Sequence, residues 1–320
     1  MAAADNFATI QSLLETLKLE TTSPQASETL KKIQTLVSTE KQRSTGILQK
    51  FRLDNQVALV TGGSRGIGFA IAQALGEAGC KVAIASVNFE NVQKAAKKLE
   101  ALGIETLALQ VEVAQKASVD AMVKKVIETW GQLHIAVNNA GIADGIGNAE
   151  DVSEDKWDKV MDVNLKGVFL CAQAEVRHML QNGYGRIINI GSISGYVSAS
   201  SSNEAIYETS KAGVIRLSKA MASEYADKGV TINCISPKAM ASEYADKGVT
   251  INCISPGYIS TDMVNDPAFA HLVPKWISVI PMKRIGNTEE LCGAALLLAS
   301  PLSSYTTGSD VVVDGGYLLW

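Results

Sequence analysis

From Val57 onward, short apolar runs alternate with longer segments of helical periodicity, and this alternation restricts the fold more than any other feature. Continuous runs of Val, Ile and Ala are typical of strands buried on both faces, and intervening helices allow such strands to run parallel. The sequence therefore predicts an α/β fold with a doubly wound parallel sheet, whose ligands bind beyond the carboxyl ends of the strands. The expected strands are Val57–Thr61, Lys81–Ser86, Thr106–Val111, His134–Asn138, Arg186–Gly191 and Val311–Val313, and the expected helices are Ile67–Ala78, Asn91–Leu102, Ser118–Trp130, a helix near Trp157–Met179 and one from about Tyr207.

A glycine-rich turn follows the first expected strand, in the run Thr61-Gly62-Gly63-Ser64-Arg65-Gly66-Ile67-Gly68. Glycine lets a backbone turn tightly and approach a pyrophosphate closely. A helix that begins near Ile67 would aim free N–H groups at that phosphate. Between the first strand and helix of such a unit, the turn indicates a Rossmann-type dinucleotide-binding domain.

Two regions are expected along the chain. Residues 1–50 contain two short amphipathic patterns, Phe7–Leu17 and Leu30–Leu36, and are interpreted as an N-terminal helical extension; a mobile tail is the alternative. Residues 51–320 form the Rossmann-type catalytic domain. Within that domain Lys219–Pro237 is repeated without change as Lys238–Pro256. A sheet has one slot between two neighbours, so we expect Val249–Ser255 to be the strand and residues near Asp227–Ala245 to be looped out.

Composition excludes several classes of partner. The chain is 47% hydrophobic and 19% charged, with a net charge of -4 and no basic block, so we expect no nucleic-acid or membrane partner. Its five cysteines and three histidines show no metal-ligand spacing, so we expect no metal. The first 50 residues resemble neither a secretory signal nor a mitochondrial presequence, and the cytoplasm is the expected compartment.

A tyrosine and a lysine lie four residues apart in Tyr207-Glu208-Thr209-Ser210-Lys211. Residues four apart share one face of a helix. A phenol with a pKa of about 10 is a poor base near neutrality, but a nearby ammonium favours the phenolate and lowers that pKa. The pair is therefore a candidate for general acid–base chemistry.

With these motifs in view, the region from about Phe51 to Trp320 resembles the short-chain dehydrogenase/reductase family. Asn138-Asn139-Ala140-Gly141 is similar to the family's N-N-A-G motif, and Asn164 and Ser192 match its active-site asparagine and serine. Pro256–Thr261 is similar to its P-G-x-I-x-T turn at the nicotinamide.

The resemblance implies roles for these residues. Tyr207 would exchange the substrate proton, Lys211 would lower the pKa of Tyr207 and bind the ribose, and Ser192 would stabilise the reacting oxygen. Asn164 would hold a water that connects Lys211 to solvent, and Ser194 is the competitor for the role of Ser192. The expected cofactor-binding residues are Gly62, Ser64, Arg65, Gly66, Ile67, Gly68, Ser86, Glu112, Asn138, Ala140, Gly141, Tyr207, Lys211, Pro256, Gly257, Ile259 and Thr261.

The residues after the second strand favour NADP(H) over NAD(H). An acid at that position binds the ribose 2′-OH of NAD and would repel a 2′-phosphate. Here the strand ends in Ser86-Val87-Asn88, and Arg65 can supply a cation to the phosphate. Val87 argues against NADP(H), because many NADP(H)-dependent members of the family have arginine at this position.

The expected function is hydride transfer between NADP(H) and a secondary alcohol or ketone. The C-terminal segment looks most like fungal polyol and ketose members of arabinitol, mannitol or sorbose type, so a small polyol or ketose is the expected substrate. A 3-oxoacyl thioester reductase is the alternative enzyme, and a non-catalytic nucleotide-binding sensor or scaffold is the alternative of another class. The resemblance also implies a homotetramer or homodimer.

Overall fold

The computed structural model describes residues 46–143, 147–198, 204–225, 249–267 and 270–319. The chain divides into two compact units, Met1–Arg52 and Leu53–Trp320. In the first unit the described part is a 3₁₀ turn, Ile47–Phe51, so both expected N-terminal helices lie outside the described residues. The second unit contains the sheet and every candidate site residue.

A seven-stranded parallel sheet confirms the predicted doubly wound fold. The strand order is β3-β2-β1-β4-β5-β6-β7, so the chain runs outward in one direction from β1 and in the other from β4. In such a sheet, ligands bind at the reversal point, beyond the ends of β1 and β4. The strands are β1 Val57–Thr61, β2 Lys81–Ser86, β3 Thr106–Gln110, β4 Ile135–Asn138, β5 Gly185–Ile190, β6 Val249–Pro256 and β7 Asp310–Val313.

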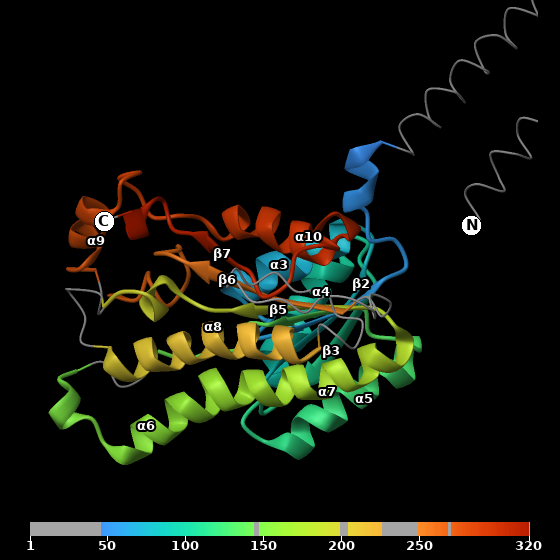
Figure 1. The fold of residues 1–320 in the computed structure, drawn as a ribbon, viewed down its shortest axis with the longest axis horizontal. Coiled ribbons are helices and arrows are strands. Elements are labelled where there is room, and N and C mark those ends of the chain that lie inside the picture. The colour runs from blue at the N-terminus through green and yellow to red at the C-terminus, as the bar shows by residue number, and fades with distance from the viewer. Residues whose placement is uncertain (1–45, 144–146, 199–203, 226–248, 268–269, 320) are drawn as a thin grey trace, which may run out of the picture. The chain divides into compact units, whose positions relative to one another are not determined.

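Helices cover both faces of the sheet, as Figure 1 shows. Alternate strand residues supply the two cores: Ala58 and Val60 of β1 pack towards one helix layer, and Val57 and Leu59 towards the other. The first layer contains α3 Gly66–Glu77, α4 Phe89–Glu100 and α10 Cys292–Ala299, and the second contains α5 Lys116–Trp130, α7 Gly167–Asn182 and α8 Ala205–Tyr225. Two shorter helices are α6 Glu154–Met161 and α9 Val273–Val279.

The tandem repeat is divided between a helix and a strand. The first copy supplies the end of α8, up to Tyr225, and the second copy supplies β6, which pairs with β5 and β7. The prediction that the second copy fills the sheet is therefore confirmed. Most of the segment expected to be looped out lies among residues 226–248, outside the described residues.

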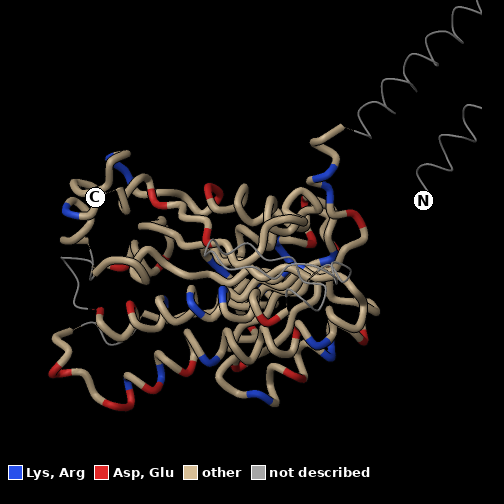
Figure 2. Tube along the Cα trace, in the orientation of Figure 1, with Lys and Arg blue, Asp and Glu red and all other residues tan. Residues whose placement is uncertain are grey.

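Charges of both signs are interspersed over the helical surface (Figure 2). Several are paired one helical turn apart, as in Lys94 with Glu90 and Lys166 with Asp162. Such exposed pairs stabilise a helix only slightly. In the part of the chain that the structure describes, no helix is long and apolar enough to cross a membrane.

Candidate active site

Three loops meet where the strand order reverses. They follow β1, β4 and β5, which lie side by side in register, with Thr61 opposite Asn138 and Asn138 opposite Asn189. The glycine-rich turn, the Asn138–Gly141 segment and Ser192 therefore lie at one edge of the sheet. This brings together motifs that are far apart in the sequence.

Close backbone packing explains why the first loop needs glycine. Gly62 and Gly66 have φ values of 64° and 55°, in the left-handed region that glycine adopts readily. A Cβ at Gly68 would lie 2.4 Å from Asn139 Nδ2 and 2.5 Å from the Gly62 carbonyl oxygen. By contrast, a Cβ at Gly66 would meet only Thr261, at 3.5 Å. The backbone of the turn is thus tightly packed at Gly68 and only loosely packed at Gly66.

Asn139 holds this turn in place, a role that the sequence analysis did not assign. Its Nδ2 donates to the carbonyl oxygens of Thr61 and Gly62, at 3.0 and 3.2 Å. Its backbone N–H and that of Ala140 both donate to Thr61 Oγ1. The position of Asn139 in the N-N-A-G motif could have indicated a functional role. Its hydrogen-bond partners, Thr61 and Gly62, could not be predicted, because they lie 78 and 77 residues away in the sequence.

The neighbouring Asn138 points its side chain elsewhere. Its Nδ2 donates to Glu175 Oε2 at 2.9 Å and to Asn189 Oδ1 at 3.0 Å. Both partners are fully buried. The side chain of Asn138, which was expected to bind the cofactor, therefore forms hydrogen bonds in the interior of the fold.

Tyr207 and Lys211 project from the first turns of α8 towards the ends of β4 and β5. Lys211 is 5% exposed, and its Nζ donates to the Ile190 carbonyl oxygen at 2.9 Å. The same Nζ lies 5.7 Å from the centroid of the Tyr207 ring. A Cβ added to Gly141 would lie 3.5 Å from Lys211 Nζ and 3.4 Å from Asn164 Oδ1. The side chains of Lys211 and Asn164 therefore adjoin the loop after β4.

Burial changes the pKa values of this pair in opposite directions. It raises the pKa of the Tyr207 phenol to about 12, against the lowering effect of a hydrogen bond with Ser192, and Glu204 adds a smaller increase. It lowers the pKa of the Lys211 ammonium to about 8. The structure differs here from the expectation that lysine lowers the tyrosine pKa, because desolvation of the phenolate is the larger effect. The phenol keeps its proton near neutral pH, while the lysine can exchange one.

Ser192 is the second residue after β5 and is 8% exposed. Its Oγ accepts a hydrogen bond from the Ser194 backbone N–H at 3.1 Å, and its side chain hydrogen-bonds Tyr207. Ser194, the competitor, is the middle residue of the short 3₁₀ turn Ile193–Gly195 and is half-buried. The geometry thus favours Ser192 as the serine at the tyrosine.

Asn164 links three elements from a single π-helical turn, Asp162–Lys166, between α6 and α7. Its amide exchanges hydrogen bonds with the Ile142 backbone, at 2.8 and 2.9 Å, and donates to Ser210 Oγ at 3.1 Å. The expected single helix near Trp157–Met179 is therefore wrong in detail, since the π turn interrupts it. Turns of this kind are frequent at functional sites. The water-holding role of Asn164 stays a prediction.

The residues expected at the adenosine end are more exposed. Ser86 ends β2 and is half-buried, while Val87 is 59% exposed. Glu112 follows β3 and is exposed. Arg65 forms an exposed ion pair with Asp262, 3.2 Å between Nη1 and Oδ2. A phosphate at Arg65 would thus compete with a carboxylate that sequence reasoning did not foresee.

The turn after β6 lies against both β7 and the glycine-rich loop. The Gly257 N–H donates to the Val313 carbonyl oxygen at 2.9 Å, and a Cβ at Gly257 would lie 2.7 Å from Asp314 Cα. Ile259 is buried and pairs with Gly286. A Cβ at Gly66 would lie 3.5 Å from Thr261 Cγ2. The turn after β6 therefore reaches the glycine-rich turn through Thr261.

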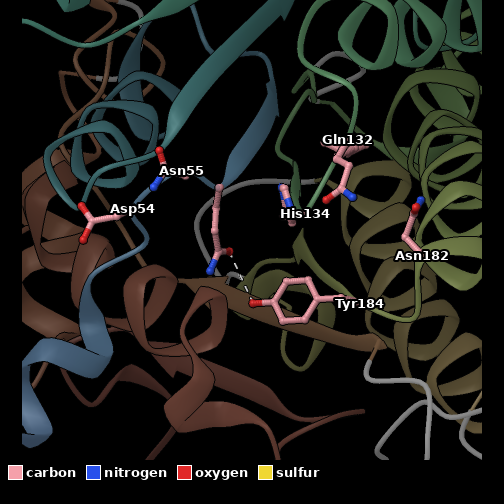
Figure 3. A pocket seen from close by; sticks show the side chains of 8 residues that line it. Asp54, Asn55, Gln132, His134, Asn182 and Tyr184 are labelled. Carbon is pink, nitrogen blue, oxygen red and sulfur yellow. Dashed lines mark hydrogen bonds between the residues drawn. The ribbon is translucent and has the colours of Figure 1, made fainter. Parts of the chain in front are cut away.

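A separate polar cavity lies at the amino ends of the central strands, opposite the candidate site (Figure 3). It has a volume of about 310 Å³, and its lining residues come from segments that precede β1, β4 and β5. It is therefore distinct from the candidate site. Its lining consists of Asp54, Asn55, Gln56, Gln132, Leu133, His134, Asn182 and Tyr184.

Comparison with known families decides what kind of protein this is. Residues 56–240 match the family model described as short chain dehydrogenase. The chain belongs to the short-chain dehydrogenase/reductase family. Residues 237–318 match a related model described as enoyl-(acyl carrier protein) reductase. The two matches overlap at residues 237–240, across the junction between the two copies of the repeat.

Individual members of the family differ in what they act on. Cyclohexanol dehydrogenase of Acinetobacter sp. strain SE19 is 35% identical over 266 residues, covering 83% of this chain and 96% of the relative. A 3-oxoacyl-(acyl-carrier-protein) reductase of Chlamydia muridarum is 37% identical, covering 82% and 98%. A probable NADP-dependent mannitol dehydrogenase of Yarrowia lipolytica is 34% identical, covering 86% and 91%. This short-chain dehydrogenase/reductase is thus an oxidoreductase whose relatives include alcohol and polyol dehydrogenases.

Solved structures of the family share the fold. A gluconate 5-dehydrogenase from Burkholderia cenocepacia J2315, in complex with NADP and tartrate, has a TM-score of 0.74 at 34% identity. The match covers 86% of this chain and all of that one.

Proposed function

We propose that this chain is an NADP(H)-dependent oxidoreductase that transfers a hydride between the nicotinamide and a secondary alcohol or ketone of a small polyol or ketose. One observation carries the proposal: buried Lys211 and Ser192 adjoin the half-buried Tyr207, beside the loop after β4 that packs on the glycine-rich turn. A general acid–base group, an amine and a hydroxyl at the mouth of a dinucleotide crevice are the groups this reaction needs.

The residues of the crevice fit a dinucleotide. The first backbone N–H groups of α3, at Gly66, Ile67 and Gly68, have no acceptor within the helix, and Arg65 makes no side-chain cap there. A Cβ at Gly66 would make only ordinary contact, at 3.5 Å from Thr261, so the backbone there is not tightly covered. Ser86, Val87 and Asn88 carry no carboxylate that would repel a 2′-phosphate, which supports NADP(H). Several relatives and neighbours are described as NADP-dependent or NADP-bound.

The chain's own residues would move the proton. The hydride chemistry would be supplied by the nicotinamide when it is bound. With its raised pKa, Tyr207 holds a proton that it can donate to the oxygen of a ketone. Ser192 would donate a hydrogen bond to the same oxygen and stabilise the charge that develops there. Lys211, with a pKa of about 8, can return a proton to Tyr207 near neutral pH.

A turnover assay tests this function. The full chain is incubated with NADPH or NADH and a panel of ketoses, cyclic and linear ketones and one 3-oxoacyl thioester. We expect the highest kcat/KM with NADPH and a ketose. Turnover restricted to NADH would contradict the cofactor, and nucleotide binding without turnover of any compound would instead support a sensor or scaffold.

A 3-oxoacyl thioester reductase is the second candidate. The 37% identity to a 3-oxoacyl-(acyl-carrier-protein) reductase favours it as much as the polyol relatives favour the first. The same assay separates the two, because the thioester would then have the highest kcat/KM of the panel.

A further inference from the structure

Glu175 is a carboxyl group buried where no charge is expected. It lies in the middle of α7, faces the sheet and is 0% exposed. Glutamate is almost never fully buried unless a cation pairs with it. Within the described ranges its hydrogen bond comes from a neutral amide, that of Asn138.

Two oxygen atoms at this contact are left without partners. Asn138 Nδ2 donates to Glu175 Oε2 at 2.9 Å, whereas Glu175 Oε1 and Asn138 Oδ1 are buried and lack a hydrogen bond to any described residue. An ionised carboxylate and an amide carbonyl can only accept, so they cannot satisfy each other. A carboxylic acid has one O–H to donate. With a proton on Oε1, the acid and the amide could satisfy both orphaned oxygens through a second hydrogen bond.

The surroundings favour the neutral acid. α5 packs on α7 with the apolar side chains Val119, Met122, Val123 and Val126, and the strands present Asn138 and Asn189. The titratable group beside Glu175 is the Cys171 thiol, one turn earlier in α7, whose own pKa burial and Glu175 raise well above its usual value. Burial likewise raises the pKa of Glu175 to about 7, although the hydrogen bond from Asn138 acts in the opposite direction.

The contact lies directly beneath the candidate site. Asn138 ends β4 and precedes Asn139, which holds the glycine-rich turn. Asn138 also donates to Asn189, whose amide donates to Ser218 Oγ in α8, the helix of Tyr207 and Lys211. A change in the protonation of Glu175 would therefore affect both the loop after β4 and helix α8, because hydrogen bonds through Asn138 connect it to each of them.

We propose that Glu175 is a neutral carboxylic acid that pairs with the Asn138 amide through both of its oxygens and positions the Asn139–Gly141 loop. When the acid ionises, its proton passes to solvent and the hydrogen bond to Asn138 Oδ1 is lost. Two acceptors then face each other and the loop loosens. That this loop contacts a nucleotide rests on the proposed function, whereas the protonation of Glu175 does not.

The direction of the pH effect follows from the pKa values. The carboxyl has a usual pKa of 4.5 and about 7 in the folded chain. A raised pKa in the fold means that stability is present in full below 4.5 and is lost as the pH rises to about 7. The folding equilibrium constant should fall on the order of a hundredfold across this interval and stay level above it.

Carboxyl NMR of the wild-type chain, labelled with ¹³C in glutamate, tests the protonation directly. We expect one glutamate resonance to titrate near pH 7 and to be missing in Glu175→Gln. If every glutamate titrates below about pH 5, the range of ordinary carboxyls, the proposal is overturned. Because the titration itself uses the wild-type chain, it stands even if the variant folds poorly.

Hydrogen exchange tests the positioning role. The Asn139 and Ala140 amides, bonded to Thr61 Oγ1, should lose protection above pH 7 in the wild type. In Glu175→Gln their protection should not change with pH, because a second amide can donate to Asn138 Oδ1 without titrating. Glu100→Gln removes an exposed carboxyl at the end of α4 and should behave like the wild type. Equal protection in wild type and Glu175→Gln at every pH would overturn the role.

Nucleotide affinity separates this inference from the proposed function. If the loop binds NADPH, the wild-type Kd divided by that of Glu175→Gln should rise by up to about tenfold per pH unit above 7. A constant ratio would overturn the link to the site. If no variant binds NADPH, the proposed function fails, while the NMR and exchange results still decide the state of Glu175.

Discussion

At the scale of single residues, the proposed chemistry depends most on Tyr207. Tyr207→Phe keeps the ring, which is packed against Lys211, and removes the hydroxyl that would carry the proton. We expect kcat to fall by at least about a hundredfold with the best substrate of the panel. Nucleotide affinity, measured by NADPH fluorescence, should stay near that of the wild type.

Tyr305→Phe is the matched control, because this tyrosine is 79% exposed and is not one of the candidate site residues. It should retain full turnover. A Tyr207→Phe enzyme with more than about a third of wild-type turnover would disprove the assignment of Tyr207, since loss of a general acid normally costs far more.

Ser86 tests the proposed cofactor at the same scale. Ser86→Asp places a carboxylate at the end of β2, where it would face a 2′-phosphate and accept from a 2′-hydroxyl. We expect the preference for NADPH over NADH in kcat/KM to fall by about tenfold or more, roughly 1.4 kcal/mol. Ser304→Asp adds the same charge at an exposed position and should leave the ratio unchanged. A wild-type chain that works better with NADH would refute the interpretation of Ser86 and Arg65.

At the scale of elements, the packing of the glycine-rich turn on the loop after β4 decides whether the crevice forms. Gly68→Ala would force a Cβ to within 2.5 Å of two neighbours, Asn139 and Gly62. Overpacking of this kind costs about 1–3 kcal/mol. We expect a lower Tm and weaker NADPH binding.

Gly293→Ala provides the comparison, because a Cβ at Gly293, in α10, meets nothing within 4 Å. Alanine is favoured over glycine in a helix by about 0.5–1 kcal/mol, so this variant should melt slightly higher. If both variants melt like the wild type, the crowding at Gly68 does not constrain the fold.

The tandem repeat is a second question at this scale. Deleting Lys219–Pro237 or Lys238–Pro256 leaves the same sequence, in which one copy both ends α8 and forms β6. Since the sheet has one slot between β5 and β7, the shortened chain should keep its activity and have a higher Tm. Differential scanning fluorimetry and the turnover assay measure both. A shortened chain that is inactive, or that melts lower, would show that the insertion is functional.

At the scale of the whole molecule, exposed apolar side chains suggest self-association. Phe169 on α7 is 39% exposed, Val312 on the edge strand β7 38%, and Leu319 near the C-terminus 76%. Burying apolar surface between subunits would stabilise a complex. We expect a homotetramer, or at least a dimer, by light scattering at micromolar concentration. A monomer at that concentration would contradict this prediction.

The fold and the central residues of the candidate site could be predicted from local sequence patterns. The alternation of strands and helices, the glycines after β1 and the four-residue spacing of Tyr207 and Lys211 are short-range features, because each depends on residues a few positions apart. Element boundaries were harder to predict: the π turn at Asp162–Lys166 carries Asn164, whose hydrogen-bond partner Ile142 lies 22 residues away.

Contacts over long sequence separations were decided by the tertiary structure alone. Asn138 meets Glu175 37 residues away, and Arg65 meets Asp262 197 residues away. The raised pKa of Tyr207 also belongs to this class, since it reflects partial desolvation of the phenol in the folded chain. By itself the sequence determined which elements form and which reactive residues they carry, because periodicity and turn chemistry act locally. Which polar atoms meet, and how strongly each is desolvated, depended on the packing of distant segments, which no local pattern encodes.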